Sequence, residues 1–201
     1  MAVAWQFGRW QGAYPFAFLS GDSANIAGFA AALDHPGNFT GDAILSDPAN
    51  FRFYQTIHLP LIRALTKITG DYGTSFIWLL GWHVLVQAVG FYILGRILFH
   101  RRYWAALYAI MTLVPVQLNL EFWGAWSDPL PRFSFQALLP YLLAAALRWR
   151  SSPIAWPWLM AAAGVLVYVH PVSAPGWGLA LWLGFVWGAP AAWSYQKKMT
   201  V

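Results

Sequence analysis

Uncharged runs of mostly apolar residues alternate with short polar segments over most of this chain. Ser75 to Gly95 is a run of 21 residues without a formal charge, and basic residues follow it, beginning at Arg96. Further uncharged runs occupy 103–120 and 133–147. About 20 consecutive apolar residues are needed to cross a bilayer as a helix. Each run therefore predicts a membrane-spanning helix.

The segment from Ser151 to Gln196 also lacks a formal charge, but its 46 residues are too many for a single span. It divides at 170–175, where Pro171 and Pro175 would interrupt helical hydrogen bonding. The pattern predicts an all-α fold, a polytopic transmembrane bundle over 75–201. Its spans, about five, are expected at 75–95, 103–120, 133–147, 154–169 and 176–193.

The first 74 residues predict an external segment that precedes this bundle. Ser20-Gly21-Asp22-Ser23 is typical of a turn that opens a short helix through residue 33. Later, Ile57, Leu61, Leu65 and Ile68 recur at helical spacing, which predicts an amphipathic helix on the membrane surface. An alternative is that 13–33 itself spans the membrane, although Asp22 would be costly in mid-membrane.

The composition changes the class of protein that can be considered. Hydrophobic residues make up 59% of the 201-residue chain and charged residues only 9%, against about 25% charged in soluble domains. This indicates an integral membrane protein. The chain has no cysteine, which removes thiolate catalysis and Cys-ligated metal sites. It also lacks nucleotide-binding, HExxH and nucleophile-elbow motifs.

The net charge of +5 is informative mainly through its distribution. Seven of the twelve basic residues fall in the connections 96–102 and 148–153 and in the tail after 193. The positive-inside rule places these segments in the cytoplasm, and 1–74, 119–132 and 170–175 outside, as in a bacterial cytoplasmic membrane. The charge predicts contact with anionic membrane lipids and no nucleic-acid partner.

Several short motifs in the outer segments resemble those of one enzyme class. The motifs are Gly21-Asp22, Asp34-His35-Pro36, Gly41-Asp42, Asp47-Pro48, Ile57-His58-Leu59-Pro60-Leu61, Glu121-Phe122-Trp123-Gly124, Asp128-Pro129-Leu130-Pro131-Arg132-Phe133 and Tyr168-Val169-His170-Pro171. Over about 15–185 the chain resembles polytopic glycosyltransferases of the C structural class, most closely uncharacterised bacterial members. Those enzymes use polyprenyl-phosphate-linked sugars, and they normally have a helix before the first acidic loop and nine or more spans. The resemblance thus implies an N-terminal portion or a reduced relative.

Carboxylates near a membrane surface suit this chemistry, because glycosyl transfer needs a base that deprotonates the acceptor hydroxyl. The resemblance implies that Asp22 is the catalytic base, since the family's catalytic aspartate lies early in its first external loop. The alternative is that Asp22 only caps a helix. Asp47 and Glu121 are candidates for a second base or for ligands of Mg²⁺ or Mn²⁺. Each could instead be a solvated loop acid.

Three basic side chains are candidates for binding the substrate phosphate. Arg132 follows Pro131 at the outer mouth of a predicted span and could hold a lipid phosphate, or simply extend to the interface. His170 could contact phosphate or assist proton transfer, or it could cap a helix end. Arg63, with Arg52 and Lys67, could bind anionic head groups.

His83 is the ionisable residue that lies well inside a predicted span. Gln87, one turn away, could hydrogen-bond it. Alternatively, His83 could be an axial ligand of a haem or a chlorophyll-type pigment. Two functions therefore remain: a glycosyltransferase-like enzyme that uses a polyprenyl-linked donor, and a non-catalytic membrane subunit that packs in a larger photosynthetic or respiratory complex and binds lipid or pigment.

Overall fold

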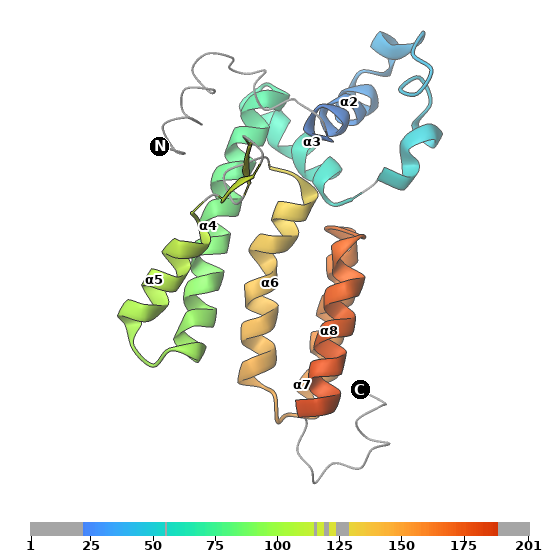
Figure 1. Ribbon diagram of the computed structural model, residues 1–201. Coiled ribbons are helices and arrows are strands. Elements are labelled where there is room, and N and C mark those ends of the chain that lie inside the picture. The colour runs from blue at the N-terminus through green and yellow to red at the C-terminus, as the bar shows by residue number, and fades with distance from the viewer. Residues whose placement is uncertain (1–21, 55, 115, 119–120, 124–128, 189–201) are drawn as a thin grey trace. The chain divides into compact units, whose positions relative to one another are not determined.

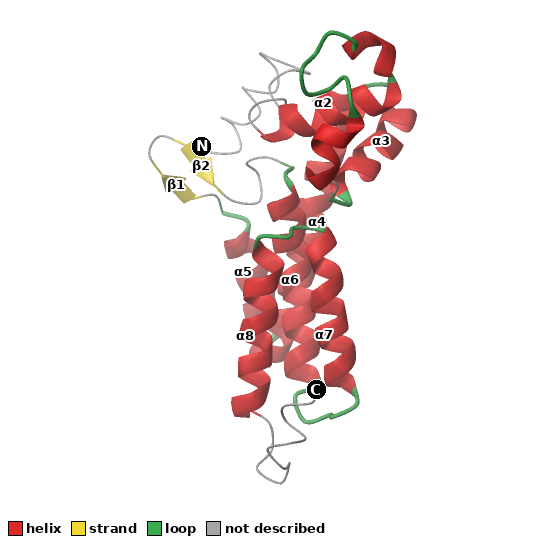
Figure 2. Ribbon diagram, turned by 90° about the vertical axis from the view of Figure 1, so that its right-hand side faces the viewer, coloured by secondary structure: helices red, strands yellow, loops and turns green. Residues whose placement is uncertain are grey.

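The protein is known from a computed structural model, which describes residues 22–54, 56–114, 116–118, 121–123 and 129–188. Backbone contacts divide the chain into two compact units. Unit 1 comprises 1–85 and 113–133, and unit 2 comprises 86–112 and 134–201. The fold is predominantly helical, with one pair of short strands (Figures 1 and 2).

The helices of unit 1 pack around one apolar core. They are α2 (Asp22–Asp34), the short 3-10 helices η2 (Pro36–Phe39) and η3 (Pro48–Tyr54), α3 (His58–Thr69) and the first part of α4 (Tyr72–Leu98). Small residues on α2, among them Ala27 and Ala30, let this helix pack closely against α3. Its Ile26 packs with Ile62, Phe76 and neighbouring leucines, and all of these side chains are at most 9% exposed.

A tight turn connects α3 to α4. Gly70 adopts a left-handed conformation with φ of 86°, which glycine reaches without steric cost, and its N–H donates to the carbonyl oxygen of Thr66. Asp71 then accepts a hydrogen bond from the Thr74 N–H at 2.8 Å, as a cap at the start of α4. These two residues end one helix and begin the next.

Helix α4 has 27 residues and a length of about 40 Å, enough to cross a hydrocarbon core of about 30 Å. Among the described residues it is the one helix that is both long and apolar enough to span a membrane. The segment Ala155–Tyr168 is apolar but shorter. The predicted span at 75–95 lies within α4.

The predicted helix over 103–120 is wrong in its last part. Helix α5 (Arg102–Thr112) has 11 residues, and two short strands follow it, β1 (Val116–Leu118) and β2 (Glu121–Trp123). The strands pair antiparallel, with Gln117 opposite Phe122 (Figure 2). The residue before a proline is disfavoured in the α region, so Pro115 explains why helical structure stops here.

Unit 2 contains the later part of α4, α5 and three further helical segments. These are α6 (Pro131–Arg148, of which residues from 134 belong to unit 2), α7 (Ala155–Val165) extended by the 3-10 helix η4 (Leu166–Tyr168), and α8 (Ser173–Gly188). Helices α7 and α8 pack side by side (Figures 1 and 2). Trp156 and Phe185, with ring centroids 4.3 Å apart, join them in the core with Leu142. The interruption predicted at 170–175 lies between η4 and α8, where Ser173 already begins α8.

Candidate functional site

Asp22 lies on the first turn of α2 with its side chain exposed. The carboxylate has no hydrogen-bond partner among the described residues, so within them it does not cap the helix through the N–H groups of Ala24 or Asn25. Tyr54 is near enough for the charge of Asp22 to raise the pKa of its phenol, although burial contributes more to that shift. Asp22 therefore combines solvent access with a neighbouring hydroxyl group.

The other described aspartates of unit 1 stabilise local structure. Asp34 accepts hydrogen bonds from Arg63 Nε at 2.7 Å and from the Tyr72 hydroxyl at 3.0 Å. Asp42 accepts from the N–H groups of Ile44 and Leu45, both at 2.8 Å, and these two bonds hold the pKa of its carboxyl below the ordinary value. Such aspartates fix turns and helix contacts.

The two acids predicted as metal ligands are separate cases. Asp47 is exposed and accepts a hydrogen bond from the Ala49 N–H at 2.9 Å, an arrangement that fixes the start of η3. Glu121 is in β2, and its side chain lies outside the described part of the structure. Within the side chains that are described, no three His, Asp or Glu residues gather at a place where they could hold a metal ion.

The basic candidates lie in different settings. Arg63 is engaged by Asp34 in an ion pair that joins α3 to α2. Arg132, in the first turn of α6, is exposed and lies over the ring of Phe133, 5.5 Å from its centroid. In unit 2, His170 Nδ1 accepts from the Ser173 N–H at 3.1 Å and is 2.8 Å from the Ser173 hydroxyl. His170 therefore caps the start of α8.

Two histidines form a pair in the core of unit 1. The rings of His58 and His83 have centroids 5.8 Å apart, and the side chains are 0% and 4% exposed. His58 Nε2 donates to the carbonyl oxygen of Pro129 at 2.8 Å. His83 is enclosed by packed side chains, and its role as an axial ligand of a haem or pigment stays a prediction. In unit 2, Gln87 Nε2 donates to the carbonyl oxygen of Thr112 at 3.1 Å.

An apolar groove lies between α3 and α4 within unit 1. It has a volume of about 370 Å³ and is lined by Leu61, Leu65, Trp78, Leu79, Gly81, Trp82 and Leu85. Trp78 and Trp82 are 61% and 60% exposed, and the apolar stripe of α3 is exposed beside them at Leu61 and Ile68. The groove can take up an apolar chain. Leu61 and Leu65 of this lining belong to the predicted amphipathic stripe, and the other residues belong to the first half of the predicted span 75–95.

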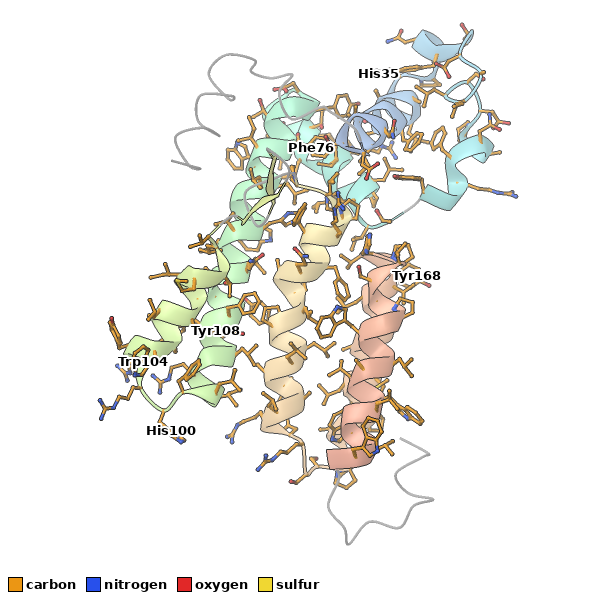
Figure 3. The ribbon with its side chains drawn as sticks, viewed as in Figure 1. His35, Phe76, His100, Trp104, Tyr108 and Tyr168 are labelled. Atoms are coloured by element: carbon orange, nitrogen blue, oxygen red, sulfur yellow. The ribbon has the colours of Figure 1, made fainter. Side chains whose placement is uncertain are left out.

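The sequence did not predict the positions of two residues of this unit, Tyr54 and His58. Nothing in the sequence indicates that Tyr54 lies near Asp22, because their proximity depends on the path of the chain through η2 and η3. Tyr54 packs against Phe29 of α2, with ring centroids 5.1 Å apart. His58 was expected only as part of an external motif, yet it is fully buried. Figure 3 shows the packed side chains around Phe76, and it shows His35, which is exposed, just beyond the end of α2.

Comparisons with known proteins do not identify a family for this chain. No protein-family model, curated protein or solved structure matches this chain. The resemblance to C-class glycosyltransferases stays a prediction that depends on the motifs of the sequence.

Proposed function

We propose that this chain is a polytopic membrane protein that transfers a sugar from a polyprenyl-phosphate donor at the outer surface of a bacterial cytoplasmic membrane. The groove between α3 and α4 is the observation that carries this proposal. It offers an apolar surface to a lipid chain, and it belongs to the unit in which all seven carboxylates of the sequence fall. A lipid-linked substrate needs both features at one membrane surface.

The proposed bundle extends beyond α4. Helix α6 has 18 residues and a length of about 27 Å, and the described part of α8 has 16 residues and a length of about 24 Å. With the apolar segment Ala155–Tyr168, these lengths fit a bilayer that thins locally around short helices. Helix α5, at about 16 Å, reaches only part of the way.

Charge distribution supports the proposed orientation. Unit 1 contains five Lys and Arg residues with the seven acids, whereas unit 2 contains seven Lys and Arg residues and no acid. An excess of basic residues marks cytoplasmic connections. The connections 99–101 and 149–154 are therefore cytoplasmic in this proposal, and residues 22–71 are outside.

Asp22 is the proposed general base. It would take the proton of the acceptor hydroxyl as the acceptor oxygen attacks the anomeric carbon of the sugar. The bond from that carbon to the phosphate oxygen breaks, and the polyprenyl phosphate leaves as an anion. Arg132 is exposed and is the proposed contact for this phosphate, because a guanidinium can form two parallel hydrogen bonds with it. Arg63, which forms an ion pair with Asp34, would add a second positive charge near the substrate phosphate in this proposal.

The substitution Asp22→Asn tests the proposal. The protein would be reconstituted with undecaprenyl phosphate carrying glucose or mannose, and release of undecaprenyl phosphate would be measured with membrane extract as the source of acceptors. Loss of a general base lowers the rate by roughly 10²- to 10⁴-fold. The matched control is Asn25→Ala, which removes another exposed polar side chain from the same helix and should leave transfer unchanged. Full transfer by the Asp22→Asn variant would refute the catalytic role.

A further inference from the structure

A second cavity, in unit 2, combines an apolar interior with a cationic rim. Its volume is about 560 Å³, within the range of roughly 300–1,000 Å³ that is usual for small-molecule sites. Five helices contribute to the lining, including Leu98 of α4, Tyr108 of α5, Leu147 of α6, Trp156 of α7 and Phe185 of α8. Arg150 is the charged member of the lining. An amphiphile with an anionic end matches this distribution.

The position of Arg150 is fixed by its backbone. Trp156 Nε1 donates to the Arg150 carbonyl oxygen at 3.2 Å, and the indole ring is buried against Phe185. The connection after α6 is further held by the Ser152 N–H, which donates to the Trp149 carbonyl oxygen at 2.9 Å. The Arg150 side chain itself is exposed at the edge of the cavity. The backbone of Arg150 is thus fixed beside an apolar cavity that its exposed side chain lines.

The formal charges of unit 2 are all of one sign. Arg150 lines the cavity, whereas Arg96, Arg101, Arg102 and Arg148 are outside its lining. Figure 3 shows His100 and Trp104 at one end of unit 2, opposite Tyr168. No Asp or Glu occurs anywhere in the sequence of unit 2. No acidic side chain of this unit can therefore neutralise Arg150, and an anionic head group can. Tryptophan at the same level is typical of a lipid interface.

We propose that this cavity binds one anionic phospholipid, with an acyl chain between the helices and the phosphate at Arg150. The inference depends on the membrane placement of the proposed function, but it does not depend on glycosyl transfer. Charge complementarity selects an anionic lipid over a zwitterionic one, because a zwitterionic head group adds a second cation to a rim that is already basic.

Native mass spectrometry of the full chain, released from detergent micelles, tests this proposal. Protein would first be equilibrated with phosphatidylglycerol or with phosphatidylcholine of the same acyl chains. One phosphatidylglycerol should remain bound to the wild-type chain, with at least tenfold preference over phosphatidylcholine. Arg150→Gln should remove most of that preference, since a charge-assisted contact to phosphate is lost. The control Arg148→Gln removes an equal charge outside the cavity lining and should retain it.

A second variant tests the apolar part of the cavity. Gly184 lines the cavity, and a Cβ built there meets no atom within 4 Å, so Gly184→Leu can fill the space without a backbone clash. It should abolish retention of both lipids. Gly178→Leu, on the same helix and equally unobstructed but outside the lining, is the matched control and should leave retention unchanged.

The outcomes separate this proposal from its alternatives. Equal retention of the two lipids, or retention unaffected by both Arg150→Gln and Gly184→Leu, would overturn it. So would a co-purifying protein mass in place of lipid, which would assign the cavity to a partner chain, or displacement of the lipid by millimolar inorganic phosphate alone. Asp22→Asn should retain phosphatidylglycerol like the wild type, so a failure of sugar transfer and a failure of lipid binding can be distinguished.

Discussion

Gly90 shows how a single residue fixes helix packing in unit 2. A Cβ at this position would lie 2.6 Å from Tyr141 Cε2 and 2.7 Å from Pro140 Cγ, both well inside van der Waals contact. Neither neighbour can move easily. The proline ring is rigid, and the Tyr141 hydroxyl donates to the Val86 carbonyl oxygen at 2.8 Å. Close approach of small residues is a usual way for helices to associate in membranes.

We expect Gly90→Ala to destabilise the protein by about 1–3 kcal/mol, because overpacking forces neighbouring side chains to shift. The measurement is thermal unfolding of the detergent-purified chain followed by circular dichroism. Gly81→Ala is the matched control, since it lies on the same helix with no atom within 4 Å of its Cβ position. That change should be neutral or stabilising by about 1 kcal/mol through helix propensity. Equal destabilisation by both substitutions would contradict the proposed steric cause.

At the level of elements, α3 has two apolar faces with different environments. Leu59 and Ile62 are 4% and 0% exposed in the core of unit 1. Ile57, Leu61 and Ile68, on the predicted stripe, are 53%, 37% and 76% exposed. Exposed apolar side chains at helical spacing, next to exposed tryptophans of α4, mark a surface that binds lipid or another apolar partner.

Because the chain has no cysteine, single cysteine substitutions can carry a spin label without background. In reconstituted bilayers we expect a label at Ile68→Cys to collide with oxygen, which concentrates in lipid. A label at Lys67→Cys should collide with a water-soluble nickel chelate. The two positions are adjacent and both exposed, so they serve as controls for each other. Similar accessibility to the chelate at both positions would show that α3 faces water on both sides.

Local sequence patterns could predict several of these elements. The period of Ile57, Leu61 and Ile68 indicates α3, and Pro171 indicates the interruption before α8. Pro175 lies in the first turn of α8, where a proline is tolerated. The end of α5 was also open to prediction, because Pro115 disfavours a helix at the preceding residue. The uncharged run 103–120 alone does not indicate where α5 ends. The absence of charge indicates an apolar environment for a segment, but it does not determine the conformation of its backbone.

The candidate site was only partly open to prediction, because much of it depends on long-range contacts. The burial of His58 depends on a carbonyl oxygen 71 residues later, at Pro129. Nothing near His58 in sequence indicates that contact. The structural role of Asp34 likewise depends on Arg63 and Tyr72, which reach it from α3 and α4. Local turn chemistry, in contrast, is sufficient to explain the hydrogen bonds of Asp42 and Asp47.

For the molecule as a whole, the separation of charge between the two units is the main organising feature. Unit 1 has a formal charge of −2, from five basic and seven acidic residues, and unit 2 has +7, from seven basic and no acidic residues. The acids of 1–85 and of 113–133 are far apart in the sequence, yet the fold assigns both segments to one unit. That all the acids lie on one side of a membrane stays a prediction.

The orientation can be measured with an impermeant maleimide on intact bacterial cells that express single-cysteine variants. Ser46 and Ser151 are suitable positions, because both are exposed and lie in connections of unit 1 and unit 2 respectively. We expect Ser46→Cys to react in intact cells and Ser151→Cys to react only after permeabilisation. The positive-inside rule predicts this sidedness, because Ser151 lies in a connection that follows Arg148 and Arg150 and is therefore expected in the cytoplasm. The unsubstituted chain, which has no thiol, gives the background. Labelling of both positions from outside would mean that the segments between them cross the membrane an even number of times or not at all, and the proposed bundle would then be incorrect.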